Sequence, residues 1–256
     1  MPTFSRACST LILGFSCLAS ALDPSCAPGG NFNLKPWMLQ LPIGSTGNPT
    51  TISSSQLQGC SGYQDNGHHY FFTESGDGAL VMKVPGSPAS SGCVTTAHST
   101  HCRTELREAN PSTGGAASWQ PSSSRNRLAV TLAVTVPDNS GHGTVIGQIH
   151  IDDSVSVKPV CELYYNKAGN VVMGVEQTTD GGNSIFTSIG NIPVGQTFSY
   201  EIRYESNVLS VSLNGGAPRE LDTYELNSPP SYFKVGNYNQ GDSPSDVHFF
   251  SIDVQH

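Results

Sequence analysis

The sequence predicts an all-β sandwich, and three observations lead to that fold class. Runs of alternating apolar and polar residues recur, most clearly over residues 128–136, and turn residues bound them, as in antiparallel strands with one buried face. The chain of 256 residues contains 27 Gly and 17 Pro and shows no convincing helix pattern. Hydrophobic residues make up 36% of it, which is enough for one core, and no linker separates two domains.

The first informative element is the segment 103–107, which carries charge on one face. Side chains alternate between the two faces of a strand, so Arg103, Glu105 and Arg107 share a face while the residues between them point inward. A guanidinium group offers a planar pair of donors that suits a carboxylate. The segment therefore predicts either an anion-binding strand or an exposed ladder of ion pairs.

The segment 147–151 predicts a strand with an amide and an imidazole on its polar face. Gln148 and His150 alternate with two isoleucines that point inward. Val145 shares the inward parity whereas Ile146 does not fit, so we expect the strand to begin after Ile146. An amide donor beside an imidazole can hold a carboxylate and move a proton.

Residues 198–205 and 208–213 predict a hairpin of two ordinary strands. In the first strand, Phe, Tyr and Ile alternate with Ser, Glu and Arg. The second follows a short turn and ends at the Asn-Gly-Gly sequence of residues 214–216, which is a strong turn signal.

The segment 232–240 again combines an apolar face with a polar one. The polar face consists of Tyr232, Lys234, Tyr238 and Gln240, with a gap at Gly236. Asn237 and Asn239 interrupt the apolar face, so we expect this end of the strand to leave the core. Only 12% of the chain is charged, so the Arg, Lys, Gln, His and Tyr residues of the three polar faces predict a site for an extended anionic ligand.

The amino-terminal residues predict secretion. Residues 1–21 have the positive start, short apolar run and Ala-Ser-Ala end of a signal peptide, and the run is too short to span a bilayer. We therefore expect residues 22–256 to form a single extracellular domain. Of its five cysteines, we expect pairs Cys26–Cys60 and Cys93–Cys102 with Cys161 free, although the sequence leaves other pairings open.

The balance of charges excludes several partners. Lys and Arg number 12 against 20 Asp and Glu, which gives a formal net charge of −8. A nucleic-acid-binding protein usually needs a basic surface, so we expect no nucleic acid as partner, and we also expect no membrane partner and a monomer. The acidity conflicts with an anionic ligand unless the cations gather at one place.

Three of the segments resemble the signature strands of a known family. Arg103-Thr-Glu-Leu-Arg107, Gln148-Ile-His150 and Tyr232-Phe-Lys-Val-Gly-Asn-Tyr-Asn-Gln240 are similar, in this order, to those of polysaccharide lyase family 7, the alginate lyases. Residues 37–42 and 247–254 resemble its opening and closing strands. The resemblance implies a β-jelly roll of two antiparallel sheets with a concave cleft for the polymer. The signal peptide and the pair His101-Cys102 resemble its fungal members.

The resemblance also implies roles for eight residues. The family's catalytic quartet falls on Arg103, Gln148, His150 and Tyr238. Positions that contact the substrate or orient the site fall on Glu105, Arg107, Lys234 and Gln240. The partner would be alginate or a related polyuronate, the products would carry 4,5-unsaturated uronate ends, and no metal or other cofactor would be needed.

β-Elimination from a uronate needs charge neutralisation, a base and an acid. Arg103 and Gln148 can donate hydrogen bonds that strengthen as enolate charge develops on the carboxylate. The C5 proton can go to His150 if it is neutral, or to Tyr238 if neighbouring Lys and Arg residues lower its pKa. Tyr238 can protonate the leaving O4. In mannuronate C5–H and O4 lie on one side, so Tyr238 could serve twice, whereas guluronate would need His150 as the base.

Other functions fit parts of this pattern. The same quartet could cleave another β-1,4-polyuronate such as glucuronan, and a non-catalytic carbohydrate-binding jelly roll would need the cations but not the pair Tyr238 and His150. A metal protein could use His98, His101 and Cys102, or the pair His68-His69. Within the lyases, the Ile149 of the Gln-Ile-His motif favours guluronate-containing substrates by resemblance.

Overall fold

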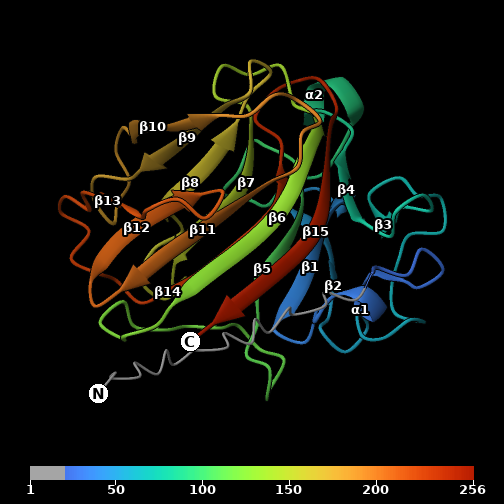
Figure 1. The fold of residues 1–256 in the computed structure, drawn as a ribbon, viewed down its shortest axis with the longest axis horizontal. Coiled ribbons are helices and arrows are strands. Elements are labelled where there is room, and N and C mark those ends of the chain that lie inside the picture. The colour runs from blue at the N-terminus through green and yellow to red at the C-terminus, as the bar shows by residue number, and fades with distance from the viewer. Residues whose placement is uncertain (1–20) are drawn as a thin grey trace, which may run out of the picture.

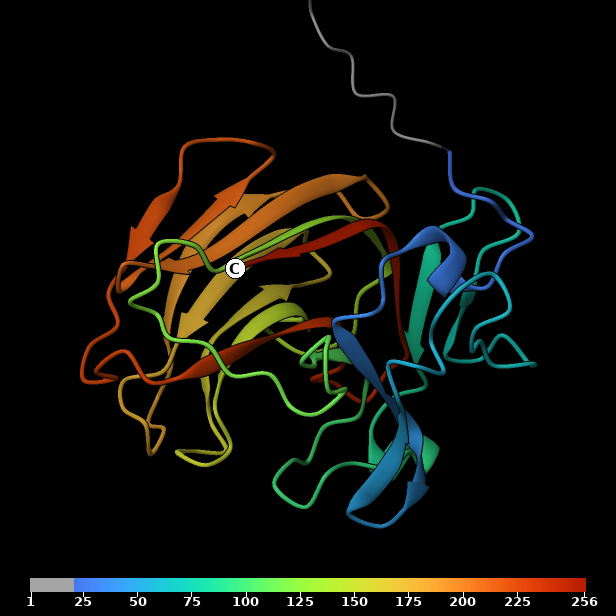
Figure 2. The same cartoon turned by 90° about the horizontal axis from the view of Figure 1, so that it is seen from below.

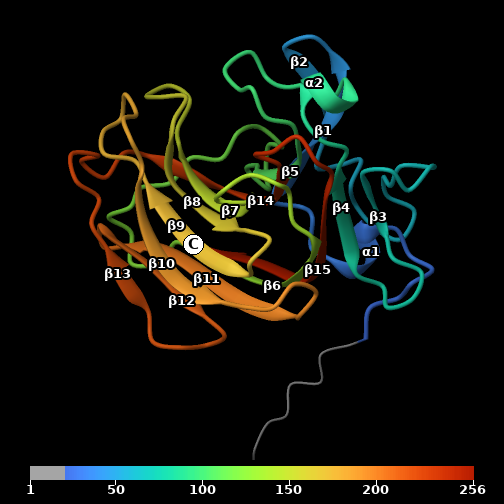
Figure 3. The same cartoon turned by 90° about the horizontal axis from the view of Figure 1, so that it is seen from above.

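Two antiparallel β-sheets packed face to face make up the protein, as Figures 1 and 3 show for a computed structural model that describes residues 21–256. The expected signal peptide, residues 1–21, lies outside the described residues except for its last position. None of the helices in the described part of the chain is long and apolar enough to cross a membrane. The all-β sandwich predicted from the alternating runs is confirmed.

The larger sheet contains eight strands in the order β10-β9-β8-β7-β14-β5-β1-β2. Their bounds are β1 (Trp37–Ser45), β2 (Asn48–Ile52), β5 (Arg103–Glu108), β7 (Thr144–Ile151), β8 (Pro159–Tyr165), β9 (Asn170–Val175), β10 (Ile185–Asn191) and β14 (Ser231–Tyr238). Strands far apart in sequence are therefore neighbours at its centre, where β14 lies between β5 and β7.

The smaller sheet contains seven strands in the order β13-β12-β11-β6-β15-β4-β3. Their bounds are β3 (Phe71–Thr73), β4 (Leu80–Val84), β6 (Arg127–Val136), β11 (Phe198–Glu205), β12 (Val208–Leu213), β13 (Arg219–Leu221) and β15 (Ser245–Gln255). The runs 128–136, 198–205 and 208–213 were predicted as strands, and they form β6, β11 and β12. Two short helices, α1 (Pro28–Asn31) and α2 (Pro88–Ser91), lie outside the sheets.

The hydrophobic core fills the space between the sheets. Its largest fully buried side chains include Trp37 and Phe233 from the larger sheet and Tyr204 and Phe249 from the smaller one. Removal of this apolar surface from water stabilises the sandwich by roughly 25 cal/mol per Å². The opposite face of the larger sheet is free of this packing and carries the polar residues singled out above.

A bulge in β7 corrects the sequence prediction for the start of that strand. The strand begins at Thr144, and Ile146 belongs to the core whereas Val145 lies opposite Tyr164 outside the core cluster. The pairing with β8 shifts between Val145 and Gly147, which inserts one extra residue and reverses the alternation before it. In the sequence the bulge appears only as an Ile146 that does not fit the alternation, and the pairing with β8 is needed to identify it as an extra residue within the strand.

The end of β14 also differs from the prediction that it leaves the core. Asn237 is fully buried, and each polar atom of its amide has a partner. Its nitrogen donates to the Met82 carbonyl at 3.0 Å, and its oxygen accepts from the hydroxyls of Thr144 at 2.6 Å and Ser245 at 2.8 Å. A satisfied amide can therefore replace an apolar side chain and join β14 to β4, β7 and β15.

Both predicted disulfides are present, Cys26–Cys60 and Cys93–Cys102. Cys161 is free and buried, and burial raises the pKa of its thiol to about 12. Because Cys102 is bonded to Cys93, it is not available as the metal ligand considered from the sequence. The second disulfide lies after α2, which is beside the β1–β2 hairpin in both Figures 2 and 3.

Candidate active site

The polar faces of β5, β7 and β14 meet in one cavity of about 560 Å³. Seven of the eight predicted site residues line it, namely Arg103, Glu105, Arg107, Gln148, His150, Lys234 and Tyr238. The eighth, Gln240, follows the end of β14 and is not a lining residue; its side-chain amide donates to the Tyr238 carbonyl at 3.2 Å. Contact between Gln240 and substrate stays a prediction.

Strand register explains why these residues converge. β14 pairs with β5 on one side and β7 on the other. Tyr238 lies opposite Arg103, and Lys234 lies opposite both Arg107 and Gln148. Directly opposed residues of an antiparallel pair have Cβ atoms about 5 Å apart on the same face. The three strands therefore place one cation-rich row of side chains along the cavity floor.

Glu105 is a buried carboxylate at the centre of this row. It accepts hydrogen bonds from the Arg103 guanidinium at 3.1 Å and from the Gln148 amide, and it lies 4.0 Å from the Lys234 ammonium. A Cβ at the facing Gly236 would lie 2.6 Å from the Glu105 Cα, so glycine permits the close approach of β14. With two hydrogen-bond donors and a third cation nearby, the buried carboxylate of Glu105 is satisfied and can orient the side chains around it.

The two guanidinium groups lie over tyrosine rings. The Cζ of Arg103 is 3.6 Å from the ring centre of Tyr238, and that of Arg107 is 4.2 Å from the ring centre of Tyr232. Arg107 also pairs with Asp153 at 2.8 Å. Within residues 21–256, the Nε atoms of both arginines are buried without a hydrogen-bond partner. An unpaired buried donor is costly, so each guanidinium holds one donor that the protein leaves unsatisfied.

His150 is held as a neutral imidazole. Burial lowers its pKa to about 2, and the positive charge of Lys234 contributes in the same direction. Its Nδ1 lies 2.8 Å from the Ile151 carbonyl, which can only accept, so Nδ1 carries the proton and Nε2 keeps its lone pair. Its ring stacks on Tyr232, with centres 5.0 Å apart. The residue can therefore accept a proton at Nε2.

Tyr238 is protonated at rest, which corrects one sequence expectation. Burial raises the pKa of its hydroxyl, and this outweighs the lowering by Arg103. The predicted effect of neighbouring cations has the right direction but is too small to reverse that of burial. The Tyr238 hydroxyl is therefore able to donate a proton.

Three carboxylates of the cavity were missed by the sequence reasoning. Asp153, Glu162 and Glu176 line the cavity, as does the cation Lys158. Glu162 lies opposite Gln148 in the pairing of β7 with β8, and burial raises the pKa of its carboxyl group. The alternation of residues 159–165 could have placed Glu162 on a polar face, but only the strand order shows that this face borders the site.

Known alginate lyases are similar to this chain along most of its length. The family model described as alginate lyase matches residues 32–256. The alginate lyase of Klebsiella pneumoniae is 28% identical over 270 residues, which cover 84% of each chain.

Two solved structures resemble the fold along most of its length. One is the family 7 alginate lyase A1-II' in complex with a product, at 29% identity and a TM-score of 0.73, with 90% of this chain and 99% of that one covered. The other is an alginate lyase from Pseudomonas aeruginosa, at 31% identity and a TM-score of 0.71, with 87% and 99% covered.

Proposed function

Because the chain belongs to the family 7 alginate lyases, whose jelly-roll fold it shares, and is an alginate-cleaving polysaccharide lyase, we propose that His150 and Tyr238 carry its proton transfers. Lyase membership favours an enzyme over a non-catalytic sugar-binding protein. The observation that carries the proposal is the meeting of Arg103, Gln148, His150 and Tyr238 in one cavity.

Charge neutralisation comes first in the proposed reaction. The uronate carboxylate, which is bonded to the C5 atom that loses its proton, would lie against the Arg103 guanidinium and the Gln148 amide, since both residues line the cavity. As the C5 proton leaves, negative charge moves onto the carboxylate, and donors fixed in a buried site stabilise it more than water would. Glu105 keeps both donors in place because it accepts a hydrogen bond from each.

The two proton transfers follow from the protonation states. His150 takes the C5 proton at Nε2, the C4–O4 bond breaks, and Tyr238 gives its proton to O4, which leaves a double bond between C4 and C5. A neutral His150 and a protonated Tyr238 support this division, which suits guluronate, where the two groups lie on opposite sides. We therefore propose a preference for guluronate-containing alginate.

Substitution of the two residues tests this assignment. Tyr238→Phe removes the donated proton and should reduce turnover of every alginate by at least 100-fold, with an unchanged fold by circular dichroism. His150→Ala should reduce cleavage of polyguluronate more than that of polymannuronate. The measurement is the near-ultraviolet absorbance of unsaturated product from each polymer, with polyglucuronate as a third substrate.

The exposed Tyr224 supplies the control, because Tyr224→Phe should have wild-type turnover. A near wild-type rate for Tyr238→Phe would refute the acid assignment. Equal losses on the two polymers for His150→Ala would refute its role as a guluronate-specific base.

We also infer that the enzyme is a secreted monomer of fungal type. The signal-peptide pattern of residues 1–21 and two disulfides in residues 22–256 support secretion. The His101-Cys102 pair before Arg103 supports the fungal type. Detection of the protein beginning near residue 22 in culture medium would test secretion, and light scattering would test the monomer.

A further inference from the structure

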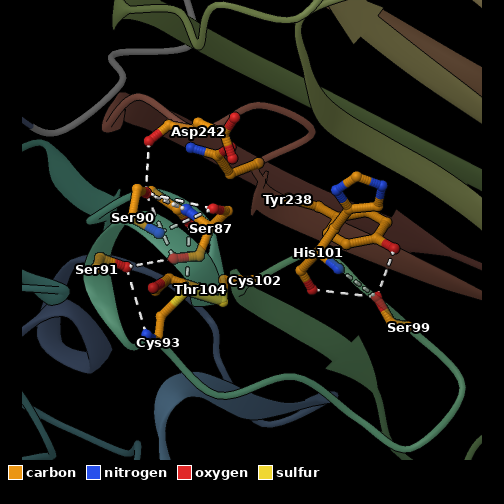
Figure 4. Close-up of a disulfide and its surroundings, with 12 residues drawn as sticks. Ser87, Ser90, Ser91, Cys93, Ser99, His101, Cys102, Thr104, Tyr238 and Asp242 are labelled. Atoms are coloured by element: carbon orange, nitrogen blue, oxygen red, sulfur yellow. Dashed lines mark hydrogen bonds between the residues drawn. A yellow bond between two sulfur atoms is a disulfide. The ribbon is translucent and has the colours of Figure 1, made fainter.

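The Tyr238 hydroxyl has a close neighbour outside the predicted site residues. Ser99 Oγ lies 3.0 Å from the Tyr238 hydroxyl oxygen, as Figure 4 shows, and Ser99 lines the same cavity. The Tyr238 ring is held by Arg103 over its face and by His101, whose ring meets it edge-on with centres 6.1 Å apart. Those contacts hold the Tyr238 ring, whereas Ser99 forms a hydrogen bond with the Tyr238 hydroxyl, the group that exchanges the proton.

The hydrogen bonds of Ser99 allow it to serve both protonation states of Tyr238. The His101 N–H donates to Ser99 Oγ at 3.0 Å, and the Ser99 hydroxyl lies 3.1 Å from the His101 carbonyl. While Tyr238 is protonated, it can donate to Ser99 and Ser99 can donate to His101. Once Tyr238 has lost its proton, the Ser99 hydroxyl can rotate and donate to the phenolate, and such charge-assisted hydrogen bonds are stronger than neutral ones.

The loop that carries Ser99 is anchored around the site. The Cys93–Cys102 disulfide closes it, and the Cys102 carbonyl accepts from the Asn239 N–H at 3.0 Å, next to Tyr238. Before the loop, Ser90 at the end of α2 donates to the Asp242 carbonyl at 2.6 Å (Figure 4). The loop is thus fixed to the segment that follows Tyr238, so Ser99 and Tyr238 are held together.

We propose that Ser99 is a positioning residue for the lyase reaction, which orients the Tyr238 hydroxyl toward the leaving oxygen and stabilises the phenolate that proton donation leaves behind. This inference depends on the proposed role of Tyr238 as the acid. The hydrogen bond acts with Arg103 to lower the pKa of Tyr238 against the raising effect of burial.

Ser99→Ala tests the proposal through kcat, KM and the pH profile on polyguluronate. We expect kcat to fall about ten-fold, since a hydrogen bond to a charged group is lost, while KM stays within about two-fold. Loss of a group that lowers the pKa of Tyr238 should also move the Tyr238-dependent limb of the kcat profile to higher pH. Ser99→Thr keeps the hydroxyl and should restore most of kcat and the original profile.

Thr100→Ala is the matched control, because Thr100 is the adjacent residue and is exposed. It should have wild-type kinetics and melting temperature. The proposal is overturned if Ser99→Ala has a wild-type kcat, if its effect lies in KM alone, or if Ser99→Thr does not rescue it. If Tyr238→Phe is inactive while Ser99→Ala is fully active, only the role of Ser99 fails and the acid assignment stands.

Discussion

Lys234 is buried beside two guanidinium groups and one carboxylate, so its charge depends on pH. Burial lowers the pKa of its ammonium group to about 8, and the Arg103 charge contributes to this. Below that pH Lys234 is a cation in the row of side chains that lines the cavity. Above it, the site loses one of the charges that attract a polyuronate.

Alginate binding should therefore weaken as pH rises through about 8. A bound polyanion favours the protonated form of the Lys234 amine, so KM should rise above this pH. Because only one proton is coupled to binding, the rise should be at most ten-fold per pH unit. Measurement of KM from pH 6 to 9.5 checks this. Lys234→Arg keeps its charge and should flatten the rise, whereas a constant wild-type KM would contradict the role of Lys234.

At the residue scale, alternation along three strands was enough to place seven of eight site residues in the cavity. The sequence did not reveal Ser99 or Asp153, because a loop and a turn have no period from which a side chain's direction follows. It also could not give the protonation state of Tyr238, since burial depends on all the surrounding strands. The local sequence pattern predicts which face of a strand a side chain lies on, whereas its pKa depends on the tertiary packing around it.

At the scale of elements, Glu108 joins β5 to β14 at the end of β5. Its carboxylate accepts from the Trp119 indole at 2.9 Å and from the Phe233 backbone N–H at 2.8 Å. The other oxygen lies 2.6 Å from His256 Nε2. Glu108 is buried, whereas His256 is partly exposed. The two buried hydrogen bonds of Glu108 should therefore contribute more to the free energy of unfolding than its contact with His256.

Glu108→Ala should lower the free energy of unfolding by about 3 kcal/mol, because it leaves two buried donors without acceptors. His256→Ala removes only a partly exposed partner and should cost at most about 1 kcal/mol. Urea unfolding of both variants measures the difference. Equal losses would show that Glu108 contributes to stability through its contact with His256 alone.

Sequence pattern predicted most elements of the two sheets but not their irregularities. The strands β6, β11 and β12 match the alternating runs closely. The predictions for Ile146 and Asn237 were both wrong. Each position depends on contacts with a neighbouring strand, and the local sequence does not indicate which strand that is. Both deviations lie beside the candidate site, where β7 and β14 depart from regular pairing between Val235 and Tyr238.

At the scale of the whole molecule, an acidic chain presents a nearly balanced cavity to a polyanion. The net charge is −8, and the cavity is lined by four cations, Arg103, Arg107, Lys158 and Lys234, and four carboxylates, Glu105, Asp153, Glu162 and Glu176. The carboxylate at the centre, Glu105, is engaged by the site's own donors. Attraction therefore acts at contact distance, while the molecule as a whole repels the polymer.

Short-range attraction at the cavity and long-range repulsion by the whole molecule together predict that kcat/KM passes through a maximum as the salt concentration rises. Screening lengths are about 30 Å at 0.01 M and about 10 Å at 0.1 M, so moderate salt should weaken the repulsion by remote acids and raise kcat/KM. At 1 M the length is about 3 Å, and the contacts with Arg103, Arg107 and Lys234 should weaken in turn.

The double variant Glu220→Gln/Asp222→Asn removes two exposed charges and should raise kcat/KM at 0.01 M but not at 0.1 M. A monotonic rise with salt would show that attraction at the cavity contributes nothing to capture of the polymer.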